Sequence, residues 1–95
     1  LYNGGTADLH EVSILGNVAR SGGGIFNDVG GTLTVRATTL RRNRHRVSGG
    51  GGCIHNAGTA TVEQSLLARC QGRIGDGGGG IYNSGSLHLV NSTIW

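Results

Sequence analysis

Apolar and polar residues alternate in four aligned rows of the sequence. Each row begins at a Gly followed by Thr or Ser, and the rows start 26, 27 and 27 residues apart, at Gly5, Gly31, Gly58 and Gly85. Three columns are apolar in every row: Ala7, Leu33, Ala60 and Leu87; Leu9, Val35, Val62 and Leu89; and Ile14, Leu40, Leu67 and Ile94. Alternation with a period of two is typical of a strand with one buried face. Each row therefore predicts one strand near its start and a second short apolar segment near its end.

A glycine-rich motif separates the rows and supplies a third apolar segment. It reads SGGGIFN at residues 21–27, GGGCIHN at 50–56 and GGGGIYN at 77–83. Successive glycines allow a positive φ at a corner and let neighbouring backbones approach without Cβ atoms between them. The Asn that ends each motif is expected to stack with its equivalents as a ladder of side-chain amides. The ladder residues are Asn3, Asn27, Asn56 and Asn83.

Three short strands in a repeat of about 27 residues describe one coil of a β-solenoid. At about 3.3 Å per residue, such a repeat has a contour of roughly 90 Å, which suits a three-sided loop stacked with a rise of about 4.8 Å. The crossover rule for parallel strands makes the winding right-handed, and the spacing is a poor match to leucine-rich repeats. We therefore predict one all-β domain, a right-handed parallel β-helix of about 3.5 coils. The coils span roughly residues 1–24, 25–53, 54–80 and 81–95, the last being partial.

Composition excludes several other classes of protein. Twenty of the 95 residues are Gly, none is Pro, and Gly does not recur at every third position, so neither a helical protein nor collagen is expected. Hydrophobic residues make up 36% of the chain and charged residues 14%, which argues against a charge-rich disordered tail and against a membrane span. The chain should be ordered only through its repeats.

Two stretches resemble a known family. ILGNVARSGGGIFN, residues 14–27, is similar to the paired motif of polymorphic outer-membrane-protein repeats, in which F-x-x-N precedes G-G-A-I. GGGIYNSGSLHLVNSTI, residues 78–94, is similar to repeats of large bacterial surface and secreted proteins that form right-handed parallel β-helices. This chain departs from the pattern where Cys70 replaces the Asn of Asn17 and Asn43, where Gly replaces Ala, and where Leu or Ile replaces Phe. The resemblance implies an extracellular or cell-surface location, often with adhesion or autotransport.

The densest positive charge lies in a predicted loop after the second row. Its arginines are Arg41, Arg42, Arg44 and Arg46, with His45 between the last two. Such a cluster could bind an anionic glycan, lipopolysaccharide or nucleic acid. No aromatic residue is interleaved for base stacking, so no specific nucleic-acid partner is expected. The alternative interpretation, a solvated basic loop without a ligand, is the favoured one.

The acidic residues and histidines do not form a catalytic or metal-binding pattern. The carboxylates are Asp8, Glu11, Asp28, Glu63 and Asp76, and no two of them share a column on adjacent coils. Glu63 aligns with Arg36 and predicts a surface ion pair. The histidines, His10, His45, His55 and His88, fall in four different columns, whereas a metal site needs convergent ligands. No G-K-[ST] follows the glycine runs, so they are not phosphate-binding loops. We expect no enzyme activity, catalytic residue, cofactor or metal.

Two cysteines stand 17 positions apart in one predicted coil. Cys53 occupies the place of the corner glycines Gly24 and Gly80, and Cys70 an inward-turning Asn place. A disulfide requires Cα atoms within about 7 Å, a distance that the sequence does not provide. Both a disulfide and two packed free thiols stay open, and the sequence interpretation favours the thiols. Asn91-Ser92-Thr93 is a glycosylation sequon, which has meaning only in a eukaryotic source.

A small array of threonines supplies a different functional hypothesis. Thr32, Thr34, Thr59 and Thr61 form a predicted two-by-two grid of hydroxyls, about 4.8 Å apart between coils and about 6.7 Å apart along the strand. Such T-x-T arrays resemble the ice-binding face of solenoid antifreeze proteins. Asp8 and His88 interrupt the pattern in the flanking rows.

The sequence as a whole predicts a non-enzymatic extracellular β-helix with a structural or adhesive role. It would serve as a stalk, an adhesin passenger segment or a subunit of a filament stacked head to tail. Both ends interrupt a coil, so we expect either a fragment of a longer protein or a unit that stacks on copies of itself. The expected partners are therefore another copy of the chain or a glycan or protein of a cell surface. The alternatives are an ice-binding face and a non-catalytic fragment of a polysaccharide-active β-helix enzyme.

Overall fold

The fold is a stack of parallel strands in which every sheet runs from coil to coil. The computed structural model describes residues 1–19, 23–45, 52–71 and 80–94, and in these residues all regular structure is β. Sheet A contains β1 (Tyr2–Asn3), β5 (Ile25–Asn27), β9 (Ile54–Asn56) and β12 (Ile81–Asn83). Sheet B contains β2 (Thr6–His10), β6 (Thr32–Arg36), β10 (Thr59–Glu63) and β13 (Ser86–Val90). Sheet C contains β3 (Ser13–Leu15), β7 (Thr39–Arg41), β11 (Leu66–Ala68) and β14 (Thr93–Ile94).

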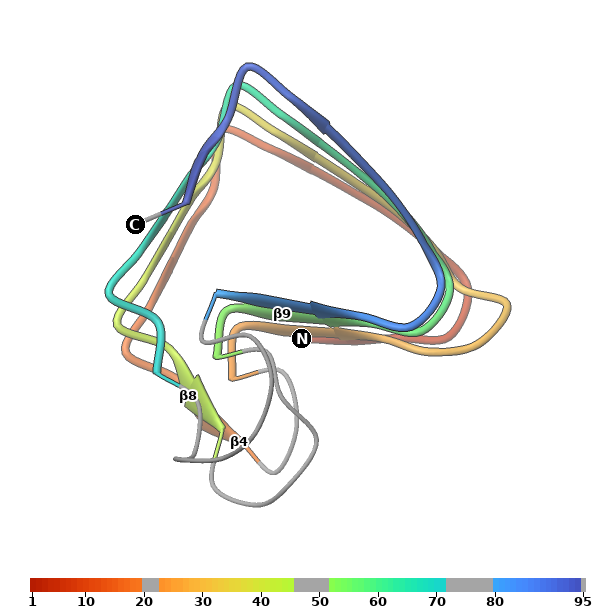
Figure 1. Ribbon diagram of the computed structural model, residues 1–95, viewed down its shortest axis with the longest axis horizontal. Coiled ribbons are helices and arrows are strands. Elements are labelled where there is room, and N and C mark those ends of the chain that lie inside the picture. Colours follow the sequence, from red (N-terminus) through yellow and green to blue (C-terminus); the bar gives the residue numbers. More distant parts are fainter. Residues whose placement is uncertain (20–22, 46–51, 72–79, 95) are drawn as a thin grey trace.

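The three sheets form the three sides of a coil. In Figure 1, viewed along the stack, sheet A lies along the bottom, sheet B along the upper right and sheet C along the left, and the coils wind in the right-handed sense. Each coil contributes one strand to each sheet, so the predicted right-handed parallel β-helix with three short strands per coil is confirmed.

The core is made of the apolar columns that the alignment predicts. The register pairs Leu33 with Ala60 and Val35 with Val62 between β6 and β10, and Leu40 with Leu67 between β7 and β11. These residues are completely or almost completely buried, as are Ile25 and Ile54 of sheet A. The residues between them along each strand point outward. At ~1.5–3 kcal/mol for each large apolar side chain removed from water, these columns are the main source of stability.

A fourth short pair of strands was not predicted. β4 (Val18–Ala19) and β8 (Arg44–His45) pair in parallel after sheet C, and Arg44 forms an isolated bridge with Gln71 of the next coil. Figure 1 shows β4 and β8 beyond the lower end of sheet C. Backbone pairing at this corner therefore links three successive coils to one another.

Two corners of the coil use left-handed backbone. Between sheets B and C the residues with positive φ are Glu11, Ala37, Gln64 and Asn91, and directly after sheet C they are Gly16, Arg42 and Arg69. The φ angles in the second set are 67°, 58° and 52°. Left-handed backbone costs a residue with a side chain roughly 1–2 kcal/mol, a penalty that glycine avoids. Arg42 and Arg69 therefore stand at positions where glycine, the residue found at the equivalent position 16, would have the lower conformational energy.

Candidate functional site

The asparagine ladder lies at the corner between sheets A and B. Asn3 donates its Nδ2 hydrogen to Asn27 Oδ1, Asn27 donates to Asn56, and Asn56 donates to Asn83, each at 2.8 Å. The same amides also bond backbone carbonyls, as Asn27 Nδ2 does with Thr59 at 3.1 Å. Asn27 and Asn56 are fully buried. The ladder residues therefore link all four coils through satisfied polar groups inside the fold.

A column of glycines follows the ladder and lets the backbones touch. A Cβ atom on Gly58 would overlap the carbonyl oxygens of Asp28 and Gly31, and one on Gly85 would overlap the carbonyl of Gly58. In the first coil Gly5 has nothing within 4 Å of such a position. Glycine is thus required at this column wherever a preceding coil is present, because the backbones of the two coils approach closely there.

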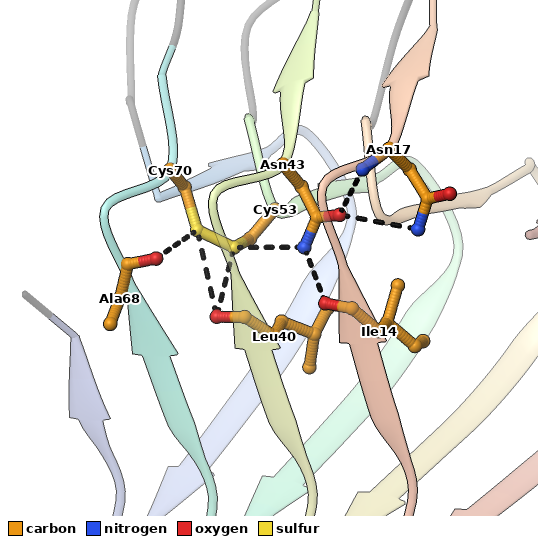
Figure 2. The surroundings of a disulfide bond; sticks show 7 residues. All are labelled: Ile14, Asn17, Leu40, Asn43, Cys53, Ala68 and Cys70. Carbon is orange, nitrogen blue, oxygen red and sulfur yellow. Dashed lines mark hydrogen bonds between the residues drawn. A yellow bond between two sulfur atoms is a disulfide. The ribbon is translucent and has the colours of Figure 1, made fainter.

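A second polar column lies after sheet C, where Asn17, Asn43 and Cys70 occupy equivalent places (Figure 2). Asn43 is fully buried, donates to the Ile14 carbonyl at 2.9 Å, and accepts a hydrogen bond from the Asn17 backbone at 3.0 Å. One coil further on, the equivalent carbonyl is that of Leu40, and it lies 3.9 Å from the Cys70 sulfur and 3.4 Å from the Cys53 sulfur. In the third coil the sulfur of Cys70 thus stands where the first two coils have an asparagine side-chain amide.

The two cysteines form a disulfide, so the favoured expectation of free thiols was wrong. Cys53 and Cys70 have Cα atoms 5.3 Å apart and are bonded to one another (Figure 2). In the preceding coil their places are taken by Gly24 and Asn43, and a Cβ on Gly24 would lie 3.1 Å from Asn43 Nδ2. The stacking geometry brings the two places into contact, a fact that linear spacing alone did not provide.

Arginines line a hollow at the same corner, on the outside of the coil. The hollow has a volume of about 470 Å³ and is lined by Val18, Arg42, Arg44, Arg69 and Gln71. The backbone nitrogen of Arg44 donates to the Asn17 carbonyl, and that of Gln71 to the Asn43 carbonyl, each at 2.9 Å. Three consecutive coils therefore contribute to one basic surface, which we call the arginine hollow.

The predicted basic cluster is only partly in this hollow. Arg42 and Arg44 line it, whereas Arg41 is exposed at the end of β7 and is not among the lining residues. Arg46 lies outside the described residues. Arg69 was missed, although it stands in the column of Arg42 when the rows are aligned. The column position, rather than the local density of charge, was the signal that would have identified it.

The four threonines lie on the outer face of sheet B. Thr32 pairs with Thr59 and Thr34 with Thr61 in the register of β6 and β10. Their flanking neighbours are Asp8 on β2 and His88 on β13. On the same face the predicted ion pair between Arg36 and Glu63 is confirmed, with 3.3 Å between Nε and Oε2. An exposed pair of this kind contributes about 0–1 kcal/mol.

An aromatic column runs along the outside of sheet A. The rings of Tyr2 and Phe26 are parallel with centroids 5.6 Å apart, and His55 lies 4.8 Å from both Phe26 and Tyr82. The aligned sequence contains these four residues in one column, at the position before each ladder asparagine. Because the rings stack on each other, they stabilise the coils and offer their edges outward.

The first aromatic residue also bonds a carboxylate. Tyr2 donates its hydroxyl hydrogen to Asp28 Oδ2, and the Val29 backbone nitrogen donates to Asp28 Oδ1 at 2.7 Å. These bonds lower the pKa of Asp28 below its ordinary 3.8, because they favour the carboxylate, with the tyrosine bond as the larger cause. The bond to Asp28 is also the main reason why the pKa of Tyr2 is raised above 10.0.

Potential metal ligands do not converge in the part of the chain that the structure describes. It contains no group of three or more His, Cys, Asp or Glu side chains able to hold an ion. His10 Nε2 lies 3.8 Å from Glu11, while His88 is on β13 opposite Thr61. No helix in the described ranges is long and apolar enough to cross a membrane.

Comparison with known proteins gives no relative from which a function could be transferred. The chain matches no protein-family model, no curated protein and no solved structure.

Proposed function

We propose that this chain is a non-enzymatic structural or adhesive segment of an extracellular or cell-surface β-helix. The observation that carries the proposal is the asparagine ladder, which joins four coils through hydrogen bonds of 2.8 Å. A continuous ladder, a continuous apolar core and an aromatic column along one side make a stiff rod whose outer faces are free to bind. Its role is to extend and display a surface.

The distribution of carboxylates favours binding over hydrolysis. Glycosidic cleavage uses two carboxyl groups facing one substrate bond. On sheet B, Asp8 pairs with Thr34, and Glu63 lies between Arg36 and Val90. Asp28 is engaged by Tyr2. Only the first coil contains two described acidic side chains, Asp8 and Glu11, and Glu11 is paired with His10. Asp76 lies outside the described residues.

The disulfide supports an extracellular or cell-surface location. Disulfides persist in oxidising compartments and are rare in the cytosol, where thiols are kept reduced. Cys53 is fully buried and Cys70 is partly buried at this corner. Mass spectrometry of the purified chain under non-reducing conditions should identify a peptide pair containing both residues.

A filament subunit is a second candidate, favoured by the exposure of core columns at the outermost coils. Leu89 is 44% exposed and Ile94 45%, although their equivalents Val62 and Leu67 are completely buried. Another coil stacked on β13 and β14 would cover these side chains and satisfy the open strand edge. The partner in this candidate is a second copy of the chain.

Mass in solution and electron microscopy test both candidates. The 95-residue chain should be measured over a concentration series by light scattering, with negative-stain images of the same samples. Filaments with an axial repeat of about 17–19 Å per chain would support head-to-tail stacking, because about three and a half to four coils rise by about 4.8 Å each. A folded monomer at all concentrations would support the stalk or adhesin role, and an unfolded chain that lacks β-sheet circular dichroism would contradict both.

A further inference from the structure

We propose that the arginine hollow is a binding site for an anionic glycan, a sugar chain bearing sulfate or carboxylate groups. This inference rests on the proposed adhesive function and names the ligand class for it. The hollow of about 470 Å³ falls within the range of about 300–1,000 Å³ that is usual for sites of small ligands. It would hold a short segment of a longer chain.

The arrangement of the guanidinium groups comes from the stacking of coils. Arg42 and Arg69 directly follow β7 and β11, and the Arg42 backbone nitrogen donates to the Ala68 carbonyl at 3.0 Å. Arg44 is held one strand further on by its pairing with Val18 and its bridge to Gln71. Planar guanidinium groups bind sulfate and carboxylate oxygens through paired hydrogen bonds. Successive coils, about 4.8 Å apart, therefore bring arginine side chains to one surface.

Two of these arginines stand at a fixed corner of the coil. Arg42 and Arg69 have φ angles of 58° and 52°, and the equivalent residue in the first coil is Gly16. Left-handed backbone also recurs at the corner between sheets B and C, so it follows from the coil geometry. The geometry therefore fixes where the two arginine side chains leave the backbone, and arginine rather than glycine stands at the two places that line the hollow.

The remaining lining residues suit a sugar better than a nucleic acid. Gln71 offers an amide that both donates to and accepts from hydroxyl groups, and Val18, which is 48% exposed, offers a small apolar surface. Binding of single-stranded nucleic acid relies on aromatic side chains that stack on bases. No aromatic ring is among the lining residues that the structure describes, and the aromatic column lies on sheet A with its rings stacked on one another.

Arg42 and Arg44 do not take part in the ion pairs found in the described ranges. Those pairs are made by His10 with Glu11 and by Arg36 with Glu63, both on other corners or faces. An anionic ligand can therefore bind these two guanidinium groups without displacing either of those carboxylates.

The test is calorimetric titration of the folded 95-residue chain with defined probes. The probes are a heparin-derived octasaccharide, a galacturonate oligosaccharide, a neutral dextran oligosaccharide, inorganic sulfate and single-stranded oligothymidine. We expect binding of one or both acidic oligosaccharides, weakening with added salt, and none of dextran. The sulfated and the carboxylated probe distinguish the two anionic groups.

Variants locate the site. Arg42→Gly should weaken binding about tenfold, because it removes charge-assisted hydrogen bonds, and it should keep the fold, because Gly16 already occupies the equivalent corner. Arg44→Gln should have a similar effect. The matched control is Arg41→Gln, which removes the same charge one residue away and should change affinity less than about twofold. Circular dichroism and the thermal midpoint of each variant establish that it is folded.

Several outcomes would overturn the inference. An equal loss in Arg41→Gln would mean diffuse attraction to a basic surface, and binding of inorganic sulfate alone would mean a small-ion site. Oligothymidine binding that is tighter and equally sensitive to Arg42→Gly would identify a nucleic-acid site. If a folded wild-type chain binds no probe, the glycan site is wrong, while the structural role, which solution mass and images test, is unaffected.

Discussion

At the scale of single residues, two glycines of one column stand in very different surroundings. Gly58 lies where a Cβ atom would overlap the carbonyl oxygens of Asp28 and Gly31, whereas the same position on Gly5 is open. Neither overlap involves a flexible side chain that could rotate away, so the backbones of two coils would have to separate. The same residue type thus has a steric role in one coil and none in another.

We expect Gly58→Ala to lower the free energy of unfolding by about 2–3 kcal/mol, as overpacking against fixed neighbours does. Gly5→Ala, the matched control, should change it by less than about 0.5 kcal/mol. Urea denaturation followed by circular dichroism measures both. Equal effects of the two substitutions would show that close approach of the backbones is not the reason for glycine at this column.

The bond between Tyr2 and Asp28 predicts a dependence of stability on pH. The folded pKa of Asp28 is below 3.8, so its contribution is present above pH 3.8 and lost as pH falls through the folded value. The folded pKa of Tyr2 is above 10.0, so its contribution is present below pH 10.0 and lost as pH rises through the folded value. Free energies of unfolding from urea denaturation at a series of pH values should therefore fall less steeply in Tyr2→Phe, both on the acid limb, where the Val29 bond to Asp28 remains, and on the alkaline limb. Tyr82→Phe, at the other end of the aromatic column, is the control and should leave both limbs unchanged.

Individual residues were predictable where one chemical type fills a column. The asparagine ladder and the apolar columns were readable because Asn, or Leu, Val and Ile, recur at each repeat. The left-handed corner between sheets B and C was not, since Glu11, Ala37, Gln64 and Asn91 have no chemistry in common. That corner is set by the coil geometry, which each of these residues tolerates.

At the scale of elements, the third coil differs from the second by its covalent closure. The disulfide joins the residue before β9 to a residue that follows β11, so one strand from each of sheets A, B and C lies between the two sulfurs. In the second coil the equivalent contact is between Gly24 and Asn43, without a bond. The same contact between the two corners is therefore covalent in the third coil and non-covalent in the second.

Reduction of the disulfide should lower the free energy of unfolding by about 3 kcal/mol, the value expected for a closed loop of this length, with a sequence separation of 17. A variant combining Cys53→Gly with Cys70→Asn should be unaffected by reductant. We expect its new amide at position 70 to bond the Leu40 carbonyl, as Asn43 bonds that of Ile14. Urea denaturation with and without reductant measures both, and a wild-type chain insensitive to reductant would contradict the prediction.

The strands of sheets A, B and C could be predicted, because period-two alternation and the repeat together place them. The pair β4 and β8 could not, since each strand has two residues and Val18–Ala19 shares no pattern with Arg44–His45. The disulfide could not be predicted either, because the distance between the two Cα atoms depends on how the coil closes. The arginine hollow was only partly predictable, because Arg42 and Arg44 belong to a visible cluster whereas Arg69 joins them through the stacking of coils.

At the scale of the whole molecule, the sides of the coil carry different chemistry. Sheet A presents stacked rings, sheet B presents hydroxyl groups, and the corner after sheet C presents arginines. The outward-facing residues of a β-helix can therefore differ from side to side while the inward-facing apolar columns stay the same.

The hydroxyl face allows a direct test of the ice-binding alternative. If Thr32, Thr34, Thr59 and Thr61 bind ice, the wild-type chain should show thermal hysteresis, and Thr34→Arg or Thr61→Arg should abolish it by placing a bulky charge within the grid. Arg36→Gln, on the same face beyond the grid, is the control and should leave hysteresis unchanged. Absence of hysteresis in the wild-type chain at millimolar concentration would exclude this alternative.

The closure of the third coil also has a mechanical consequence. If the protein is pulled by its two ends, as a stalk on a surface would be, force passes through the bond between Cys53 and Cys70 and not through the strands between them. The bond removes about 50–55 Å from the length to which the chain can be drawn out, because 17 residues at roughly 3.3–3.6 Å each are replaced by a Cα–Cα distance of 5.3 Å. The third coil would then remain a closed loop after its neighbours have been drawn out, and the bond would hold the ends of its strands close to one another when the load is released.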